Sequence, residues 1–119
     1  MPEQGDIVLI PIPFTDLSSQ KRRPVVVISN DAYHTTTADM VVVAMTSNPA
    51  PAPYSFLITS ADLSQGTLNH QGTVRVDKIY TLSQQLIVRT FGCVNAATLN
   101  RIRKLLRELT AKQSPQKAG

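Results

Sequence analysis

The stretch RRPVVVIS, residues 22–29, shows what kind of fold this chain can form. Its part from Pro24 to Ser29 is a short β-branched run bounded by turn residues, which is typical of a strand buried on both faces. Two arginines stand directly ahead of this run, where a solvated turn would normally carry Gly, Asn or Ser. The stretch therefore predicts a buried strand with a cationic cluster at its start.

Similar apolar runs before and after this stretch predict further strands. The expected strands are 7–12, 40–46, 54–59, 73–82 and 86–94. Because Pro11 and Pro13 cannot donate to a ladder, the first of these strands should end or lie at a sheet edge there. The polar connections 30–39 and 60–72 are expected to be loops.

The segment 95–112 differs in kind, because its apolar residues recur at helical spacing with basic residues between them. This pattern predicts an amphipathic helix capped by Asn95 or Thr98. Several short strands followed by one helix indicate a mainly β fold, a small and strongly bent sheet or barrel closed by that helix. We expect one domain over residues 1–112 and a flexible tail over 113–119.

The composition narrows the class of partner and the compartment. The 119 residues include 12 Lys and Arg against 8 Asp and Glu, a formal net charge of +4, which favours a polyanionic partner without identifying one. The one cysteine, Cys93, excludes an intramolecular disulfide and leaves a cysteine-based zinc site without ligands. The acidic, proline-interrupted N-terminus lacks the pattern of a signal peptide or a membrane span, so we expect a cytoplasmic protein without membrane contact.

Familiar catalytic signatures are absent. The chain has no G-x-S-x-G elbow, P-loop, G-x-G-x-x-G or H-E-x-x-H motif. His34 and His70 fall in segments expected to be loops, far apart along the chain, with no spaced cluster of carboxylates. We therefore expect no metal and no other cofactor.

Polar residues at strand ends are the candidates for chemistry. Arg23 precedes Pro24, which restricts it to extended conformations and projects its guanidinium from a stiff backbone. Thr46 closes the apolar run 40–46. Arg75 and Asp77 stand two apart and share one face of their strand. The ordinary alternatives are a solvated edge charge, a strand-end hydroxyl and a surface ion pair.

These residue types suit phosphate chemistry. An arginine is a permanent cation whose donor fork fits phosphate oxygens, and a carboxylate beside it is either an ion-pair partner or a base. Cleaving RNA without a metal requires removing a 2′-hydroxyl proton, stabilising the phosphorane and protonating the leaving 5′-oxygen. Arg, Thr and Asp side chains can share those tasks. Lys21 and Arg22 suit contacts to backbone phosphates.

Four motifs, in this order, resemble the MazF/PemK-type toxins of bacterial toxin-antitoxin systems. They are GDIVLIPIPFTD (5–16), RRPVVVISND (22–31), VVVAMTSN (41–48) and GTVRVDKIYTL (72–82). The resemblance covers roughly residues 5–110, and a weaker one links the chain to the CcdB fold. It implies a small SH3-like β-barrel of the MazF/PemK/CcdB type, assembled as a homodimer.

The resemblance also implies an activity. Family members are metal-independent, sequence-selective endoribonucleases that cleave single-stranded RNA to a cyclic phosphate and are inhibited by a cognate antitoxin. The usual catalytic pair of the family falls on Arg23 and Thr46. Some members emphasise positions matching Arg75 and Asp77 and add a His in the first loop, which 13–23 lacks, so Arg23 and Thr46 are the first assignment.

Within the resemblance, Asp77 held by Arg75 serves as a base or as an orienting group. The residues expected to bind RNA are Lys21, Arg22, Ser47 and His70. Two other functions stay open at this point. One is a CcdB-like toxin that binds gyrase without nuclease activity, and the other is a catalytically silent nucleic-acid-binding regulator.

Overall fold

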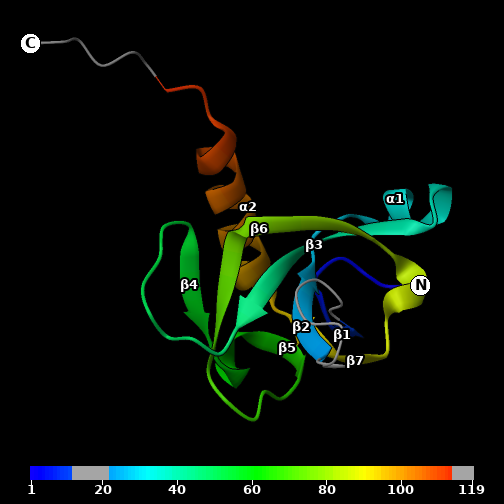
Figure 1. Ribbon diagram of the computed structural model, residues 1–119, viewed down its shortest axis with the longest axis horizontal. Coiled ribbons are helices and arrows are strands. Elements are labelled where there is room, and N and C mark those ends of the chain that lie inside the picture. Colours follow the sequence, from blue (N-terminus) through cyan, green and yellow to red (C-terminus); the bar gives the residue numbers. More distant parts are fainter. Residues whose placement is uncertain (12–21, 114–119) are drawn as a thin grey trace, which may run out of the picture.

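The described residues form a sheet of seven antiparallel strands in the order β4-β6-β3-β2-β1-β7-β5 (Figure 1). The computed structural model describes residues 1–11 and 22–113, so the predicted tail lies outside the described residues from 114 onward. The strands are β1 (Asp6–Pro11), β2 (Arg22–Val27), β3 (Asp39–Thr46), β4 (Ser55–Ile58), β5 (Leu63–Gly66), β6 (Gly72–Ser83) and β7 (Arg89–Val94). The helices are α1 (Asp31–Thr36) and α2 (Ala96–Thr110), with short 3₁₀ turns at Ser60–Asp62 and Gln84–Leu86.

The sheet curls so strongly that both of its faces are buried. Ile7 of β1 belongs to one hydrophobic cluster, while Val8 and Ile10 belong to a second cluster on the other face. Val26 of β2 likewise faces the first cluster, and Val25 faces the second. The mainly β class and the strands buried on both faces are therefore confirmed. The described part of β1 reaches Pro11, and Pro13 lies outside the described residues.

Helix α2 closes the first cluster. The Asn95 side chain accepts the Thr98 backbone N–H at 2.9 Å, so Asn95 is the cap, and Thr98 is buried. Ile102 is fully buried among strand residues, and the Arg101 guanidinium lies 4.3 Å from the ring centroid of Phe56 in β4. Figure 1 shows the C-terminal half of α2 projecting from the sheet. Neither helix of the described residues is long and apolar enough to cross a membrane.

Two connections predicted to be loops contain regular structure. The segment 30–39 holds α1, which Asn30 caps by accepting the Tyr33 N–H at 2.9 Å. His34 is consequently buried in that helix, with Nε2 2.6 Å from the hydroxyl oxygen of Ser29. The segment 60–72 holds β5, whose pairing with β7 has no counterpart in local apolar periodicity. Tertiary contacts override the polar sequence in both places.

The prediction of a regular strand over 73–82 is only partly correct, because β6 contains an irregularity. Arg75 lies opposite Ala44 of β3, but the preceding β3 residue, Val43, lies opposite Ile79 instead of Val76. Residues 76–78 are thus left outside the β3 register, as in a β-bulge. Alternation of buried valines and polar residues holds up to Asp77 and then shifts, which re-aims the side chains of the second half of β6.

Candidate active site

Two adjoining cavities lie where β2, β3 and β6 meet. The larger, of about 650 Å³, is bounded by the connection between β5 and β6, and we call it the loop pocket. The smaller, of about 350 Å³, is bounded by the irregular part of β6, and we call it the bulge pocket. Four residues line both cavities: Arg23, Pro24, Met45 and Thr46. The predicted catalytic pair therefore lies on the boundary between the two.

Strand register explains why Arg23 and Thr46 meet. Val25 of β2 lies opposite Ala44 of β3 in an antiparallel pair, so both side chains share one face of the sheet. Arg23 is two residues before Val25, and Thr46 is two residues after Ala44. The period of two keeps both on that face, and the antiparallel direction carries them to the same end.

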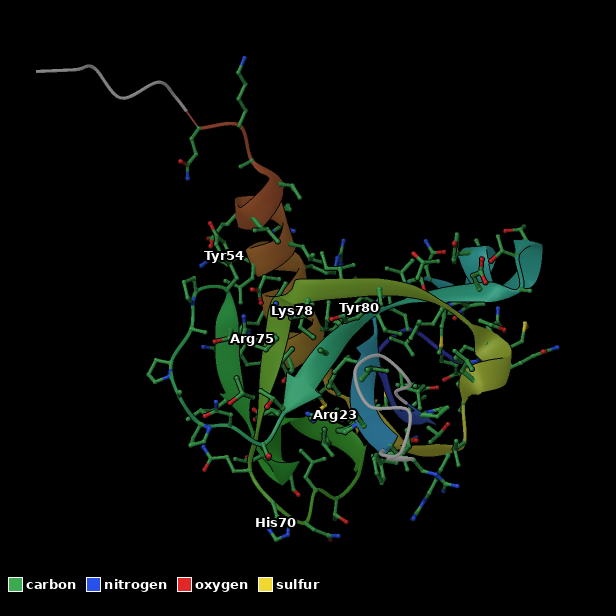
Figure 2. All side chains as sticks on the ribbon, in the orientation of Figure 1. Arg23, Tyr54, His70, Arg75, Lys78 and Tyr80 are labelled. Carbon is green, nitrogen blue, oxygen red and sulfur yellow. The ribbon has the colours of Figure 1, made fainter. Side chains whose placement is uncertain are left out.

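The two side chains are available to a ligand. The Arg23 side chain is exposed and has no hydrogen-bond or ion-pair partner among residues 1–11 and 22–113. The Thr46 hydroxyl oxygen accepts the backbone N–H of Asn48 at 3.1 Å, so its own hydrogen remains for donation. Figure 2 shows Arg23 between His70 on one side and Arg75, Lys78 and Tyr80 on the other.

Arg75 and Asp77 form a bidentate ion pair on the same face. Arg75 donates from Nε to one carboxylate oxygen at 2.9 Å and from Nη2 to the other at 2.8 Å. The hydrogen bonds from Arg75 lower the pKa of Asp77, which makes this carboxylate a weaker base. Arg75 lines the bulge pocket, whereas Asp77 contacts it only through Arg75. The geometry favours the orienting role for Asp77.

The structure brings most of the predicted site residues together. Arg22, Ser47 and His70 line the loop pocket beside Arg23 and Thr46. Arg75 lines the bulge pocket. Lys21, predicted to contact RNA, lies outside the described residues.

Several polar residues that line the cavities were not predicted from the sequence, among them two cations and a tyrosine. Arg89, at the start of β7, lines the loop pocket with its guanidinium 5.4 Å from the ring centroid of Phe91. A charged residue inside the largely apolar run 86–94 could have marked Arg89 as a candidate site residue. Lys78 and Tyr80 line the bulge pocket. A regular alternation would place Tyr80 on the opposite face from Arg75, so nothing in the sequence indicated it.

The described lining of both cavities is cationic. It contains Arg22, Arg23, Arg75, Lys78 and Arg89, and neither cavity is lined by Asp or Glu of the described residues. Such a surface attracts anions and disfavours a bound metal cation. No grouping of three or more His, Cys, Asp or Glu occurs within the described residues. Cys93 is half-buried, and burial raises the pKa of its thiol, which makes it a poor nucleophile.

Fold and site together define a small curled β-sheet protein with an arginine-rich double cavity suited to a polyanion. No curated protein matches the chain in sequence. The chain belongs to the family of PemK-like, MazF-like toxins of type II toxin-antitoxin systems, whose family model matches residues 3–110. The resemblance inferred from the four motifs is thereby confirmed.

Solved structures share the fold. An endoribonuclease from Mycobacterial species is 27% identical, with a TM-score of 0.69 and coverage of 90% of this chain and 88% of that one. An endoribonuclease in complex with its cognate antitoxin, also from Mycobacterial species, is 24% identical, with a TM-score of 0.77 and coverage of 97% and 100%. A MazE–MazF complex from Deinococcus radiodurans is 25% identical, with a TM-score of 0.71 and coverage of 91% and 94%.

Proposed function

We propose that this chain is a toxin endoribonuclease that cleaves single-stranded RNA without a metal, with sequence selectivity, to give a cyclic phosphate. The proposal is supported by membership of the toxin family and by likeness to a protein described as an endoribonuclease. The observation that carries it is the convergence of Arg23 and Thr46 on the boundary of two cationic cavities. A phosphodiester on that boundary contacts both side chains.

The proposed reaction is an in-line displacement at phosphorus. The ribose 2′-oxygen loses its proton and forms a bond to phosphorus, and the bond from phosphorus to the 5′-oxygen of the next nucleotide breaks. That oxygen takes up a proton from water, so the products are a 2′,3′-cyclic phosphate and a 5′-hydroxyl. DNA, which lacks the 2′-hydroxyl, is not a substrate. Negative charge accumulates on the non-bridging oxygens in the transition state.

Arg23 and Thr46 stabilise that charge in the proposed mechanism. The Arg23 guanidinium stays protonated, so it donates hydrogen bonds to the phosphate oxygens and to the leaving 5′-oxygen and is not a base. Thr46 donates its hydroxyl hydrogen to a non-bridging oxygen while its own oxygen is held by the Asn48 N–H. Asp77 acts as a positioning residue for Arg75. The 2′-hydroxyl proton leaves to water.

The kind of side chains at the site supports the proposed metal independence. A metal-assisted nuclease needs carboxylate or imidazole ligands around the scissile phosphate. The described cavity linings supply arginines and a lysine instead, and these provide the positive charge directly. We therefore propose that chelators leave cleavage intact.

The partners that we propose are a cognate antitoxin and a second copy of the chain. One similar protein is described as an endoribonuclease in complex with its cognate antitoxin. Cationic cavities suit an acidic antitoxin segment that occupies the RNA site. Large apolar side chains exposed in the isolated chain, Leu57, Ile79, Leu86 and Val88, are consistent with a homodimer. All of these interactions are expected in the cytoplasm.

A cleavage assay tests this function directly. Purified wild type, Arg23→Ala, Thr46→Ala and a control, Lys104→Ala on the exposed face of α2, are incubated with a long labelled RNA in EDTA. Wild type and control should cleave, and each site variant should lose about 100- to 1,000-fold in rate. Equal cleavage by all four proteins would indicate a contaminating nuclease. No cleavage by wild type would favour a gyrase-binding toxin or a silent regulator.

A further inference from the structure

The irregularity in β6 directs the side chains of Lys78 and Tyr80 toward the site, whereas a regular strand would direct them to the opposite face. Arg75 and Tyr80 stand an odd number of positions apart, so regular alternation would put them on opposite faces. Arg75 lies opposite Ala44, and Tyr80 lies opposite Val42, the same-face neighbour of Ala44 on β3. Both therefore face the bulge pocket, which Lys78 from the irregular segment also lines. Bulges commonly re-aim side chains beside active sites.

The bulge pocket lies next to the proposed reaction centre. It shares Arg23 and Thr46 with the loop pocket, so the two cavities extend from this pair in different directions. Figure 2 shows Lys78 and Tyr80 on the opposite side of Arg23 from His70. A polynucleotide with a phosphate at Arg23 and Thr46 must continue past that phosphate at both ends. One of its neighbouring nucleotides therefore meets the bulge pocket.

The chemistry of the bulge pocket fits one nucleotide. Its volume of about 350 Å³ is at the lower end of the range for small-ligand sites, about 300–1,000 Å³. Lys78 is exposed and forms no ion pair with a described residue, so it can meet a phosphate. Tyr80 is 40% exposed and offers an aromatic ring, and Ile10 and Val25 supply an apolar wall. Base stacking on aromatic rings is the usual mode of single-strand recognition.

We propose that the bulge pocket is a binding subsite for the nucleotide adjoining the cleaved phosphodiester, in which Tyr80 stacks on the base and Lys78 contacts a phosphate. This inference rests on the proposed endoribonuclease function. It makes Tyr80 a specificity-determining residue, because the base held there is next to the bond that breaks. Arg23 and Thr46 act on the phosphate itself.

The test begins by mapping the sites that wild type cuts in a long RNA. A 2′-O-methyl oligonucleotide of the mapped sequence, which cannot react, then serves as the binding probe in fluorescence anisotropy. Tyr80→Leu should weaken binding about 5- to 100-fold, whereas Tyr80→Phe, which keeps the ring, should bind within about twofold of wild type. Lys78→Ala should reduce the slope of log affinity against log salt by about one.

Cleavage kinetics and cut-site mapping supply the second readout. Tyr80→Leu should raise KM more than it lowers kcat, and it should relax base preference at one position adjoining the cut. Lys104→Ala and Tyr33→Leu, a lysine and a tyrosine remote from the cavities, are the matched controls. Unfolding midpoints of all variants report whether each is folded.

Two outcomes separate this inference from the function on which it rests. In the first outcome, wild type cleaves RNA, and the folded Tyr80→Leu and Lys78→Ala variants have the same affinity, salt slope and cut-site preference as wild type. That result would overturn the subsite alone. Wild type that cleaves nothing would overturn the proposed function. In that case a random-sequence single-stranded oligonucleotide serves as the probe, and unchanged binding by both variants would also overturn the subsite.

Discussion

Arg75 donates hydrogen bonds to both carboxylate oxygens of Asp77, two residues further along β6. The distances are 2.9 Å from Nε and 2.8 Å from Nη2. The pair fixes the guanidinium on the wall of the bulge pocket. It also neutralises the Asp77 carboxylate beside the bulge pocket, which would otherwise repel a phosphate. The side chains of Arg75 and Asp77 are only 27% and 29% exposed, so water screens this contact less than it screens a fully exposed pair.

Replacing Asp77 by Asn should destabilise the protein in a pH-dependent way. Arg75 lowers the pKa of Asp77 in the folded state, so the pair stabilises the fold above the ordinary aspartate pKa of about 4. That contribution is lost as the pH falls through the lowered pKa, where the wild-type carboxylate becomes protonated. Urea unfolding should therefore show Asp77→Asn less stable than wild type at pH 7, with a difference that shrinks as the pH falls below about 4.

A matched control separates this effect from general charge effects. Glu108→Gln removes an exposed carboxylate from α2 that forms no ion pair with a described residue, and it should leave the free energy of unfolding nearly unchanged across the same pH range. A constant difference between Asp77→Asn and wild type from pH 7 to pH 2 would show that the ion pair does not contribute. Cleavage by Asp77→Asn should fall less than cleavage by Arg23→Ala.

Arg89 should contribute to RNA affinity through charge. Its guanidinium lies over Phe91 on the wall of the loop pocket, where a backbone phosphate can reach it. Arg89→Ala should weaken binding and reduce the slope of log affinity against log salt by about one, whereas Arg89→Lys should keep that slope. Arg103→Ala, on the exposed face of α2, is the control. An Arg89→Ala slope equal to that of wild type would exclude the contact.

Much of this site could be predicted from the sequence because its parts depend on strand period and chain order. Buried runs around Val26 and Val43 fix two adjacent central strands, and polar residues at their ends then converge in space. Pro24 marks Arg23 as a stiffly held cation. The amphipathic pattern around Ile102 likewise predicts the helix that closes the first cluster.

The remaining parts depend on contacts that no local pattern encodes. Tyr80 reaches the site only because the β6 register shifts between Val43 and Ala44 of β3. Alternation with a period of two in the sequence cannot predict such a shift. His34 is buried in α1, which packs against β3, although its segment is polar. Strand β5 is short, and three of its four residues are exposed, so only its partner β7 reveals it.

The pairing of β5 with β7 requires a close backbone approach at Gly92. A Cβ atom on Gly92 would lie 2.2 Å from the carbonyl oxygen of Gln65 and 3.0 Å from Cα of Gly66. Both contacts involve backbone, which cannot rotate away as a side chain can. Gly72, at the start of β6, provides a contrast, because its Cβ would meet nothing nearer than 3.5 Å.

Gly92→Ala should therefore destabilise the protein by about 1–3 kcal/mol, because β5 must move away from β7 to admit the methyl group. Gly72→Ala, a chemically identical change, should alter the free energy of unfolding by about 0.5 kcal/mol or less. Since β5 leads directly into the connection that bounds the loop pocket, Gly92→Ala should also lower RNA affinity. Urea unfolding of both variants checks the ranking, and equal stabilities would mean that the strands do not approach as closely as described.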